Sequence, residues 1–236
     1  MRLERKYRFD ASGQIPLSLF EQIKLGELCA VALRLDGRNA IPATSSNFSL
    51  RRDSSSFLIS RSGKHKRNLN AGDFLLVDLQ GHAKAPIAPK PSDETLLHAL
   101  IYKKCPWISA VIHCHAPELE VLNPPAVQMS GHELLKALGS ADHLTPLVLN
   151  VFANSQDMAA LADSVENQQF TDGSKTSRPK TPANGPVIFV LAQHGIYCGG
   201  ETVGKAEAHL EAVLHLLKLG HYKPVQHTLK KNREET

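Results

Sequence analysis

An apolar strand pattern at residues 110–112 runs directly into the triplet His113-Cys114-His115, and no other feature of the chain constrains its fold as strongly. Side chains of an extended strand alternate between its two faces. Both imidazoles therefore point to one side of the predicted strand, while Cys114 turns to the other. Two imidazoles on one face of a strand are a geometry that suits a metal ion.

A second strand pattern, the apolar run of residues 187–192, leads to a third histidine, His194. If both strands end at the same edge of one sheet, His194 joins His113 and His115 at a single site. Three neutral nitrogen donors with an open fourth position are typical of a catalytic site for zinc or a similar divalent ion. The alternative is three hydrogen-bonded histidines beside a core, and the matching strand contexts favour the metal site.

Composition and charge limit the classes of protein to which the chain can belong. Its 236 residues, of which 42% are hydrophobic, are enough for one large domain with its own core. The net charge of +4 is modest, and basic residues cluster only at 61–67 and in the last seven residues. This distribution is weak evidence for nucleic-acid binding and fits a small anionic substrate, so no nucleic-acid partner is expected.

The cysteines and the hydropathy pattern predict the cellular setting. The four cysteines, at positions 29, 105, 114 and 198, show no paired spacing and no CxxC motif. Neither the spacing nor a secretory leader suggests disulfides, so a reducing, cytoplasmic compartment is expected. No apolar stretch approaches the roughly 18 residues of a membrane span, which predicts a soluble protein without a membrane partner.

Helical and strand patterns alternate loosely along a single predicted domain that covers residues 1–236. The first three strands are expected to form a meander. Residues 168–186 lack apolar periodicity and are predicted to be a mobile surface excursion, and the tail from about residue 230 is predicted to be frayed. Helices are expected at about 16–35, 91–104, 117–122, 131–138, 156–167 and 202–219, and strands at 47–50, 56–59, 73–79, 110–113, 147–152 and 187–192.

Seven segments follow one another in an order seen in a known family. They are SNFSLR, FLISRSGKHKRNL, DFLLVDLQG, PSDETLLHALIY, AVIHCHAPELEVL, GHELLKAL and HGIYCGGETVGKAEAHLE. On these segments the chain resembles the class II aldolase/adducin family and, within it, the methylthioribulose-1-phosphate dehydratases. The resemblance covers residues 26 to 219. Its most specific parts are the His-x-His pair and the HG dipeptide with a tyrosine two residues on.

The resemblance implies a fold, an assembly and a cofactor. The implied fold is α/β, a three-layer α/β/α sandwich with a central, mainly antiparallel sheet. The implied assembly is a homo-oligomer, a tetramer with sites near subunit contacts. One zinc ion per subunit is implied, held by His113, His115 and His194, in agreement with the argument from strand geometry.

The resemblance also implies two catalytic glutamates and a phosphate site. Glu133 matches the acid of the dehydratases, and Glu94 matches the carboxylate that the aldolases place at the metal. Without the resemblance, Glu94 is equally well explained as an acid in the first turn of a helix, and Glu133 as an exposed helical glutamate. The implied phosphate-binding residues are Ser46, which stands where the family often has glycine, and Asn47, Ser62, Gly63, Lys64 and Ser92.

Other residues have no spacing that sets them apart. Tyr197 follows the HG dipeptide and is expected to be a packed aromatic rather than a proton donor. His98, His132 and His209 are expected to be structural or surface histidines.

The implied activity is that of a zinc-dependent hydro-lyase. Such an enzyme converts 5-methylthioribulose 1-phosphate to 2,3-diketo-5-methylthiopentyl 1-phosphate in methionine salvage. A class II sugar-phosphate aldolase of the fuculose-phosphate type is the alternative, because polarising the same ketone also permits cleavage between carbons 3 and 4. A non-catalytic module like the adducin head is a further alternative, although that head has lost the metal ligands, whereas all three histidines are present here.

Overall fold

The computed structural model describes residues 15–85, 90–123, 125–170 and 185–225. Their strands form one mixed sheet in the order β3-β2-β1-β4-β8-β7-β6-β5-β9. Neighbouring strands are antiparallel except β6 and β7, which are parallel. The strands are β1 (Asn47–Arg51), β2 (Ser56–Ser60), β3 (Phe74–Asp78), β4 (Ala110–Cys114), β5 (Ala126–Met129), β6 (Leu147–Phe152), β7 (Val187–Leu191), β8 (Gly195–Gly200) and β9 (Tyr222–Val225).

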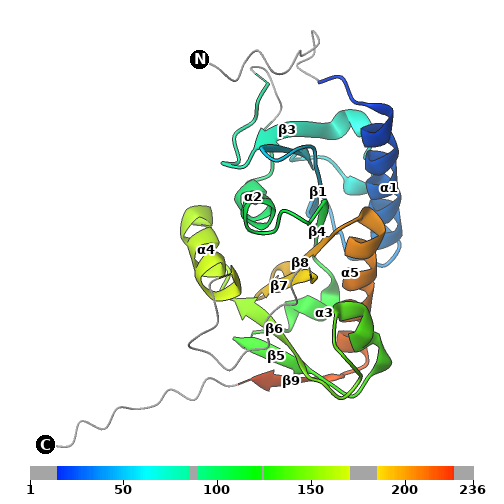
Figure 1. The fold of residues 1–236 in the computed structure, drawn as a ribbon, viewed down its shortest axis with the longest axis vertical. Coiled ribbons are helices and arrows are strands. Elements are labelled where there is room, and N and C mark those ends of the chain that lie inside the picture. Colours follow the sequence, from blue (N-terminus) through cyan, green and yellow to red (C-terminus); the bar gives the residue numbers. More distant parts are fainter. Residues whose placement is uncertain (1–14, 86–89, 124, 171–184, 226–236) are drawn as a thin grey trace, which may run out of the picture.

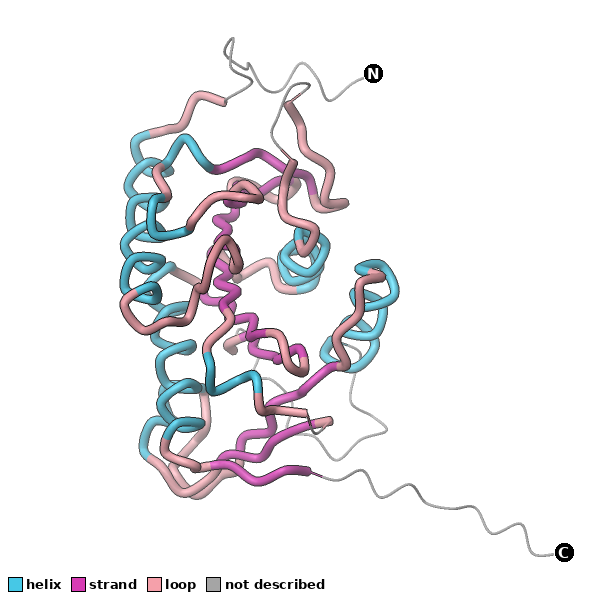
Figure 2. Tube along the Cα trace, turned by 180° about the vertical axis from the view of Figure 1, so that it is seen from behind, coloured by secondary structure: helices cyan, strands magenta, loops and turns pink. Residues whose placement is uncertain are grey.

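Helices cover both faces of this sheet, as Figures 1 and 2 show. On one face lie α1 (Leu19–Asp36), α3 (Pro117–Glu120) and α5 (Val203–Lys218), and on the other lie α2 (Thr95–Lys104) and α4 (Met158–Val165). The expected three-layer α/β/α sandwich with a mainly antiparallel sheet is confirmed. Shorter helical segments are η1 (Lys66–Asn68), η2 (Ala71–Asp73), η3 (Glu133–Leu138) and the π-helical η4 (Glu166–Phe170).

Two buried apolar clusters, one on each face, hold the layers together. Strand β4 contributes to both, because Ile112 and Cys114 pack with α1 and α5 while Val111 packs with α2 and α4. His113 is fully buried, and it stacks on Tyr197 of the cluster that contains Val111. The alternation predicted for the His113-Cys114-His115 triplet therefore exists in the folded chain.

Local sequence signals explain where the long helices begin. Ser18 precedes α1 and forms a capping box with Glu21, in which each side chain bonds the other residue's backbone N–H. Thr202 precedes α5 and accepts from the N–H of Lys205. Among the described residues, no helix combines the length and apolar character needed to cross a membrane.

Three strands depart from the sequence-based expectation. The sequence pattern predicted neither β5 nor β8 nor β9, and β8 reads GIYCGG, whose glycines are depleted in strands in general. Strand β8 forms because β4 and β7 pair with it on both sides. The expected meander of β1, β2 and β3 is confirmed by their antiparallel pairing.

The expected surface excursion at 168–186 lies mostly outside the described residues, as does the predicted frayed tail from about residue 230. The first three residues of the expected excursion, 168–170, belong to the π-helical segment Glu166–Phe170, which extends α4.

Candidate metal centre

Strand pairing brings the three histidines of the sequence motif together. His113 is the fourth residue of β4, and His115 follows this strand directly. His194 occupies the turn that joins β7 to β8, one residue before β8 begins. Because β8 runs antiparallel to β4 and pairs Ile196 with Cys114, the start of β8 lies beside the end of β4. His194 is therefore placed next to His113 and His115.

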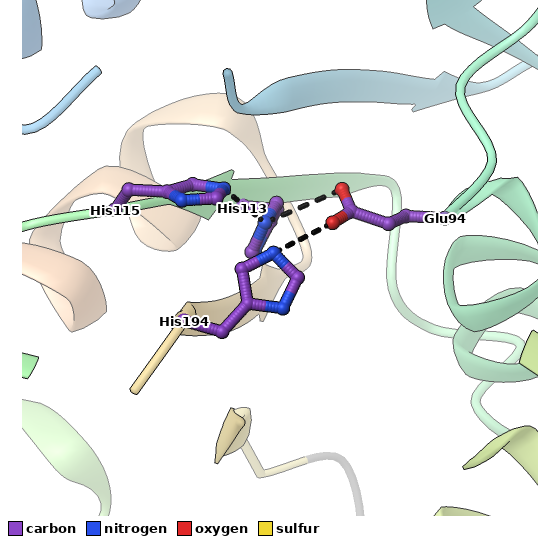
Figure 3. Close-up of side chains that lie close together, drawn as sticks. All are labelled: Glu94, His113, His115 and His194. Atoms are coloured by element: carbon purple, nitrogen blue, oxygen red, sulfur yellow. Dashed lines mark hydrogen bonds and ion pairs between the residues drawn. The ribbon is translucent and has the colours of Figure 1, made fainter. Parts of the chain in front are cut away.

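A glutamate completes the cluster (Figure 3). One ligand atom from each of Glu94, His113, His115 and His194 lies within 4.8 Å of the others. Glu94 is the residue immediately before α2, yet its side chain makes no capping hydrogen bond to that helix. Its two carboxylate oxygens instead lie 3.3 Å from Nε2 of His113 and 2.8 Å from Nε2 of His194. Glu94 therefore precedes the first turn of α2 and faces the histidines, so the alternative of a first-turn acid does not describe its contacts.

Hydrogen bonds orient two of the rings toward the centre of this cluster. Nδ1 of His113 lies 3.0 Å from the carbonyl oxygen of Ile196, which can only accept, so this nitrogen carries the hydrogen. Nδ1 of His194 likewise lies 3.2 Å from Oδ1 of Asn154. With Nδ1 engaged in this way, Nε2 is the ring atom that each histidine presents to Glu94 and to a metal ion.

The arrangement of donor atoms fits a shared cation. Nε2 of His113 lies 3.0 Å from Nε2 of His115, so lone pairs and carboxylate oxygens face one another across the cluster. Without a positive charge between them these contacts are repulsive. Bonds of about 2.0–2.1 Å to a tetrahedral zinc ion separate the ligand atoms by roughly 3.3 Å, close to the three contacts of 2.8 Å, 3.0 Å and 3.3 Å described above. Glu94 also stands at the fourth position, which the sequence pattern predicts to be open.

The protonation states favour metal binding at neutral pH. Burial alone would raise the pKa of the Glu94 carboxyl, but positive charge on the facing rings of His113 and His194, the charge that a bound cation would replace, holds it well below its usual range. Burial is the largest cause of the lowered pKa of His115, which is about 3. The site thus presents an ionised carboxylate and a neutral His115, the forms that coordinate metal ions.

The cluster lies at a polar cleft with a volume of about 530 Å³. Of the predicted phosphate-binding residues, Ser46, Asn47, Ser62 and Ser92 line it, whereas Gly63 and Lys64 are not in the described lining. The described lining residues are Thr44, Ser45, Ser46, Asn47, Arg61, Ser62, Lys66, Ser92, Asp93, Glu94, His115, Glu120, Asn154, Ser155, Gln156, Met158, Gln193 and His194.

Lys66, rather than the predicted Lys64, is the lysine among the described residues that line this cleft. The ammonium group of Lys64 binds the carboxylate of Asp73 instead. Lys66 is 2% exposed, and its Nζ donates to the carbonyl oxygens of Thr44 and Lys64, both at 2.9 Å. Burial lowers the pKa of Lys66 to about 8, although the charge of Glu94 opposes this shift. Two lysines two residues apart in one loop gave no local signal by which to choose between them.

Ser46 combines a strained backbone with an unused polar group. Its φ angle of 71° lies in the left-handed region, where glycine is the least strained residue. The hydroxyl of Ser46 is buried and has no hydrogen-bond partner within the described residues, so it is available to a ligand in the cleft.

Glu133, the predicted acid/base, lies outside the cleft lining of its own chain. It begins η3, and its side chain is 68% exposed. Its carboxylate oxygens lie 2.8 Å from Nζ of Lys136 and 3.8 Å from Nδ1 of His143. The structure therefore brings Glu94 to the histidine cluster but does not bring Glu133 there within one chain.

Tyr197 is a packed aromatic, as expected. Its ring stacks on His113, with centroids 4.2 Å apart, and on Phe189, with centroids 4.9 Å apart. It is fully buried, and its hydroxyl has no partner among the described residues. The ring packs against the face of the His113 imidazole and is not among the described residues that line the cleft.

Gly195 allows the close approach of β4 and β8 beside the cluster. A Cβ at this position would lie 2.3 Å from the carbonyl oxygen of Cys114 and 2.8 Å from Cε1 of His113. Replacing Gly195 by alanine must therefore shift a strand backbone and the His113 ring. We expect the free energy of unfolding to fall by roughly 1–3 kcal/mol or more, and metal affinity to fall with it. Chemical denaturation and metal titration measure the two effects.

Gly204→Ala is the matched control for this substitution. Gly204 is exposed in α5, and a Cβ there would meet no described atom within 4 Å. Its replacement is expected to be neutral or to stabilise the protein by at most about 1 kcal/mol. Equal stability of the two alanine variants would contradict the steric argument.

With this geometry established, comparison with known proteins identifies the family. Residues 26–220 match the model of the Class II Aldolase and Adducin N-terminal domain. The chain belongs to this family. The resemblance seen in the sequence is thereby confirmed, and the histidine cluster is that of a class II aldolase-like protein.

Relatives of this class II aldolase family member point to one branch. Methylthioribulose-1-phosphate dehydratase of Methylococcus capsulatus is 37% identical over 202 residues, which cover 84% of this chain and 93% of that protein. The dehydratase of Acidiphilium cryptum is 38% identical over 196 residues, covering 81% and 86%. Relatives with these names are lyases.

A solved structure supports the fold. The L-fuculose-1-phosphate aldolase of Thermus thermophilus superposes with a TM-score of 0.64 at 21% identity, over 84% of this chain and 94% of that one. At this identity the likeness concerns the fold alone.

Proposed function

We propose that this protein is a zinc-dependent methylthioribulose-1-phosphate dehydratase that acts in the cytoplasm as a homotetramer in methionine salvage. It converts 5-methylthioribulose 1-phosphate to 2,3-diketo-5-methylthiopentyl 1-phosphate. The observation that carries the proposal is the cluster of Glu94, His113, His115 and His194 at a polar cleft. Relatives named as this dehydratase, 37–38% identical over 81–84% of the chain, support the choice of substrate.

The reaction removes the proton on carbon 3 and the hydroxyl group on carbon 4. The products are the diketone and water, so the reaction needs no external oxidant or reductant. A divalent ion, when bound, supplies Lewis-acid stabilisation of the charge that develops on the substrate oxygens. His113, His115, His194 and Glu94 are the residues that hold it. Glu94, the carboxylate of this cluster, would serve either as a fourth ligand that substrate can displace or as a second group that moves a proton.

Glu133 takes the proton from carbon 3 and helps the hydroxyl group leave as water. Its carboxylate is ionised, because the hydrogen bond and charge of Lys136 lower its pKa. Since Glu133 is exposed and outside the cleft of its own chain, we place it in the cleft of a neighbouring subunit. The proposed tetramer thus has a chemical role, because each cleft needs a carboxylate from another copy.

The substrate phosphate lies at the end of the cleft lined by Ser46, Asn47, Ser62 and Ser92. The N-terminus of α2, which follows Ser92 and Glu94, adds the partial positive charge that favours anions. Lys66 supplies the ammonium group in place of Lys64, whose charge is already paired. Anchoring this end holds the reacting carbons still, which makes the reaction effectively unimolecular.

Lys66→Met is expected to raise KM for the sugar phosphate by roughly 10- to 100-fold, because a hydrogen bond to a charged group contributes about 1.5–3 kcal/mol. The value of kcat should change little. Lys64→Met is the matched control and should change KM less, because the Lys64 ammonium binds Asp73. Steady-state kinetics of both variants measures the difference, and a larger KM in the Lys64 variant would reverse the assignment.

The pH dependence of KM offers a second check on Lys66. Its pKa of about 8 means that the ammonium form predominates below this pH and is lost above it. KM of the unmodified enzyme should therefore rise as the pH passes about 8. In Lys66→Met this rise should be absent.

A product assay tests the function itself. Zinc-loaded protein is incubated with 5-methylthioribulose 1-phosphate, and products are followed by diketone absorbance and mass spectrometry. We expect the phosphorylated diketone, 18 mass units below the substrate because one water is lost. Aldehyde fragments without diketone would instead indicate the aldolase, and a protein that neither binds a divalent ion nor changes the substrate would indicate the interaction module.

A further inference from the structure

A chain of buried polar side chains leads from the metal cluster into the layer between the sheet and α2. Asn47 of β1 donates through Nδ2 to Oε2 of Glu94 at 2.5 Å. Oδ1 of Asn47 contacts Nε2 of His98 in α2. Nδ1 of His98 lies 2.7 Å from the hydroxyl of Ser49, which lies 2.8 Å from the hydroxyl of Tyr102. The four residues beyond Glu94 are at most 1% exposed.

The hydrogen bonds of this chain all run in one direction. An ionised Glu94 can only accept, so the amide NH₂ of Asn47 must face it, and Oδ1 must face His98. Nε2 of His98 therefore carries the hydrogen. The lone pair of the neutral ring is then on Nδ1 and accepts from Ser49, which in turn accepts from Tyr102. Burial, and then the charge of His113, lower the pKa of His98 to about 3, in keeping with a neutral ring.

We infer that His98 is a positioning residue for Glu94: by holding the Asn47 amide in one orientation, it fixes the Glu94 carboxylate at the metal cluster. A ring with its only N–H on Nε2 accepts one orientation of the amide and rejects the flipped one. Glu94 Oε1 then stays beside Nε2 of His194. The inference depends on the proposed metal site, but it does not depend on the identity of the substrate.

Two amide substitutions separate this role from simple packing. His98→Gln places an amide NH₂ near the former Nε2 and can still donate to Asn47. His98→Asn is shorter, so its amide lies near the former Nδ1, where it meets Ser49 only. We expect zinc affinity, measured by competition with a chelator, to fall by about 10- to 100-fold in His98→Asn. In His98→Gln it should stay within about threefold of the unmodified protein.

A double-mutant cycle identifies Glu94 as the group through which His98 acts. In a Glu94→Gln background, His98→Asn should cause little further loss of zinc affinity, because the carboxylate that the chain positions is gone. The visible spectrum of the cobalt-substituted protein gives a second readout of the coordination geometry. It should change in His98→Asn and not in His98→Gln.

Phe57→Leu controls for damage to the surrounding core. Phe57 is fully buried and packs on Tyr102, with ring centroids 5.0 Å apart. This variant should lower the melting temperature and leave zinc affinity unchanged. If the His98 variants do not fold, Asn47→Leu breaks the same link and should show the same loss of affinity.

Three results would each overturn the inference. The first is unchanged zinc affinity in His98→Asn or in Asn47→Leu. The second is an equal loss of zinc affinity in His98→Gln and in His98→Asn. The third is a loss of zinc affinity on His98→Asn that is as large in the Glu94→Gln background as in the unmodified protein. Failure of the proposed function is seen separately, as an unmodified protein that binds zinc but yields no diketone. The zinc titrations then still decide the role of His98.

Discussion

His113→Ala should remove metal binding and turnover together. A zinc site with four ligands contributes about 10–16 kcal/mol in favourable cases, so one ligand accounts for roughly 2.5–4 kcal/mol. This corresponds to a loss of roughly 10²- to 10³-fold in affinity. His113 is fully buried, and the Ile196 carbonyl holds its ring toward the cluster, so another side chain cannot readily take its place. His194→Ala should behave in the same way.

Metal content after dialysis, together with diketone formation, measures this prediction. His215→Ala is the control, because His215 is an exposed histidine of α5 outside the described cleft lining. It should keep the metal and full turnover. A His113→Ala protein that retains one metal ion per chain after dialysis would remove His113 from the ligand set, and with it the basis of the proposed lyase.

Glu133→Gln should keep the metal and lose turnover. Glutamine has almost the same shape as glutamate but cannot take up a proton, and loss of general acid/base catalysis lowers kcat by roughly 10²- to 10⁴-fold. The metal content should not change, because Glu133 contacts Lys136 and His143 rather than the histidine cluster. Full activity in this variant would remove Glu133 from the mechanism.

Mixing two inactive variants tests whether Glu133 acts in a neighbouring subunit. Glu133→Gln subunits keep the metal ligands, and His113→Ala subunits keep Glu133. If each site combines residues from two copies, subunit exchange between the variants should restore part of the activity. If both residues act within one chain, the mixture stays inactive.

Glu120→Gln tests whether Glu120, rather than Glu133, is the acid/base residue. Glu120 lines the cleft of its own chain, so it is a competing carboxylate for this role. We expect its replacement to change kcat far less than Glu133→Gln does. The reverse order would transfer the acid/base role to Glu120.

Much of the fold was predictable, because the signals that specify it are local. Continuous apolar runs marked β4 and β7, and apolar periodicity ended by a glycine marked α1 and α5. Strand β8 was missed because its glycines carry no strand pattern of their own. Its structure comes from pairing with β4 and β7, which a local reading of the chain does not contain.

Some residues of the candidate site could also be predicted from local sequence, and others could not. The spacing of His113 and His115 requires only that the segment be extended, so it could be read from the sequence. The choice of Lys66 over Lys64 could not, because it depends on which ammonium group meets Asp73 across the loop. His98 had no distinguishing spacing and was expected to be structural, yet its partners Asn47 and Ser49 come from a distant strand.

Local patterns along the chain were enough to predict the family, the order of most helices and strands, and the histidines available to a metal ion. These depend on periodicity and spacing over a few residues. Tertiary structure decided that Glu94 faces the histidines, that Glu133 stands apart from them, and that His98 reaches Glu94 through Asn47. Such contacts join residues far apart in the chain, so their geometry arises only when the sheet and its helices pack together.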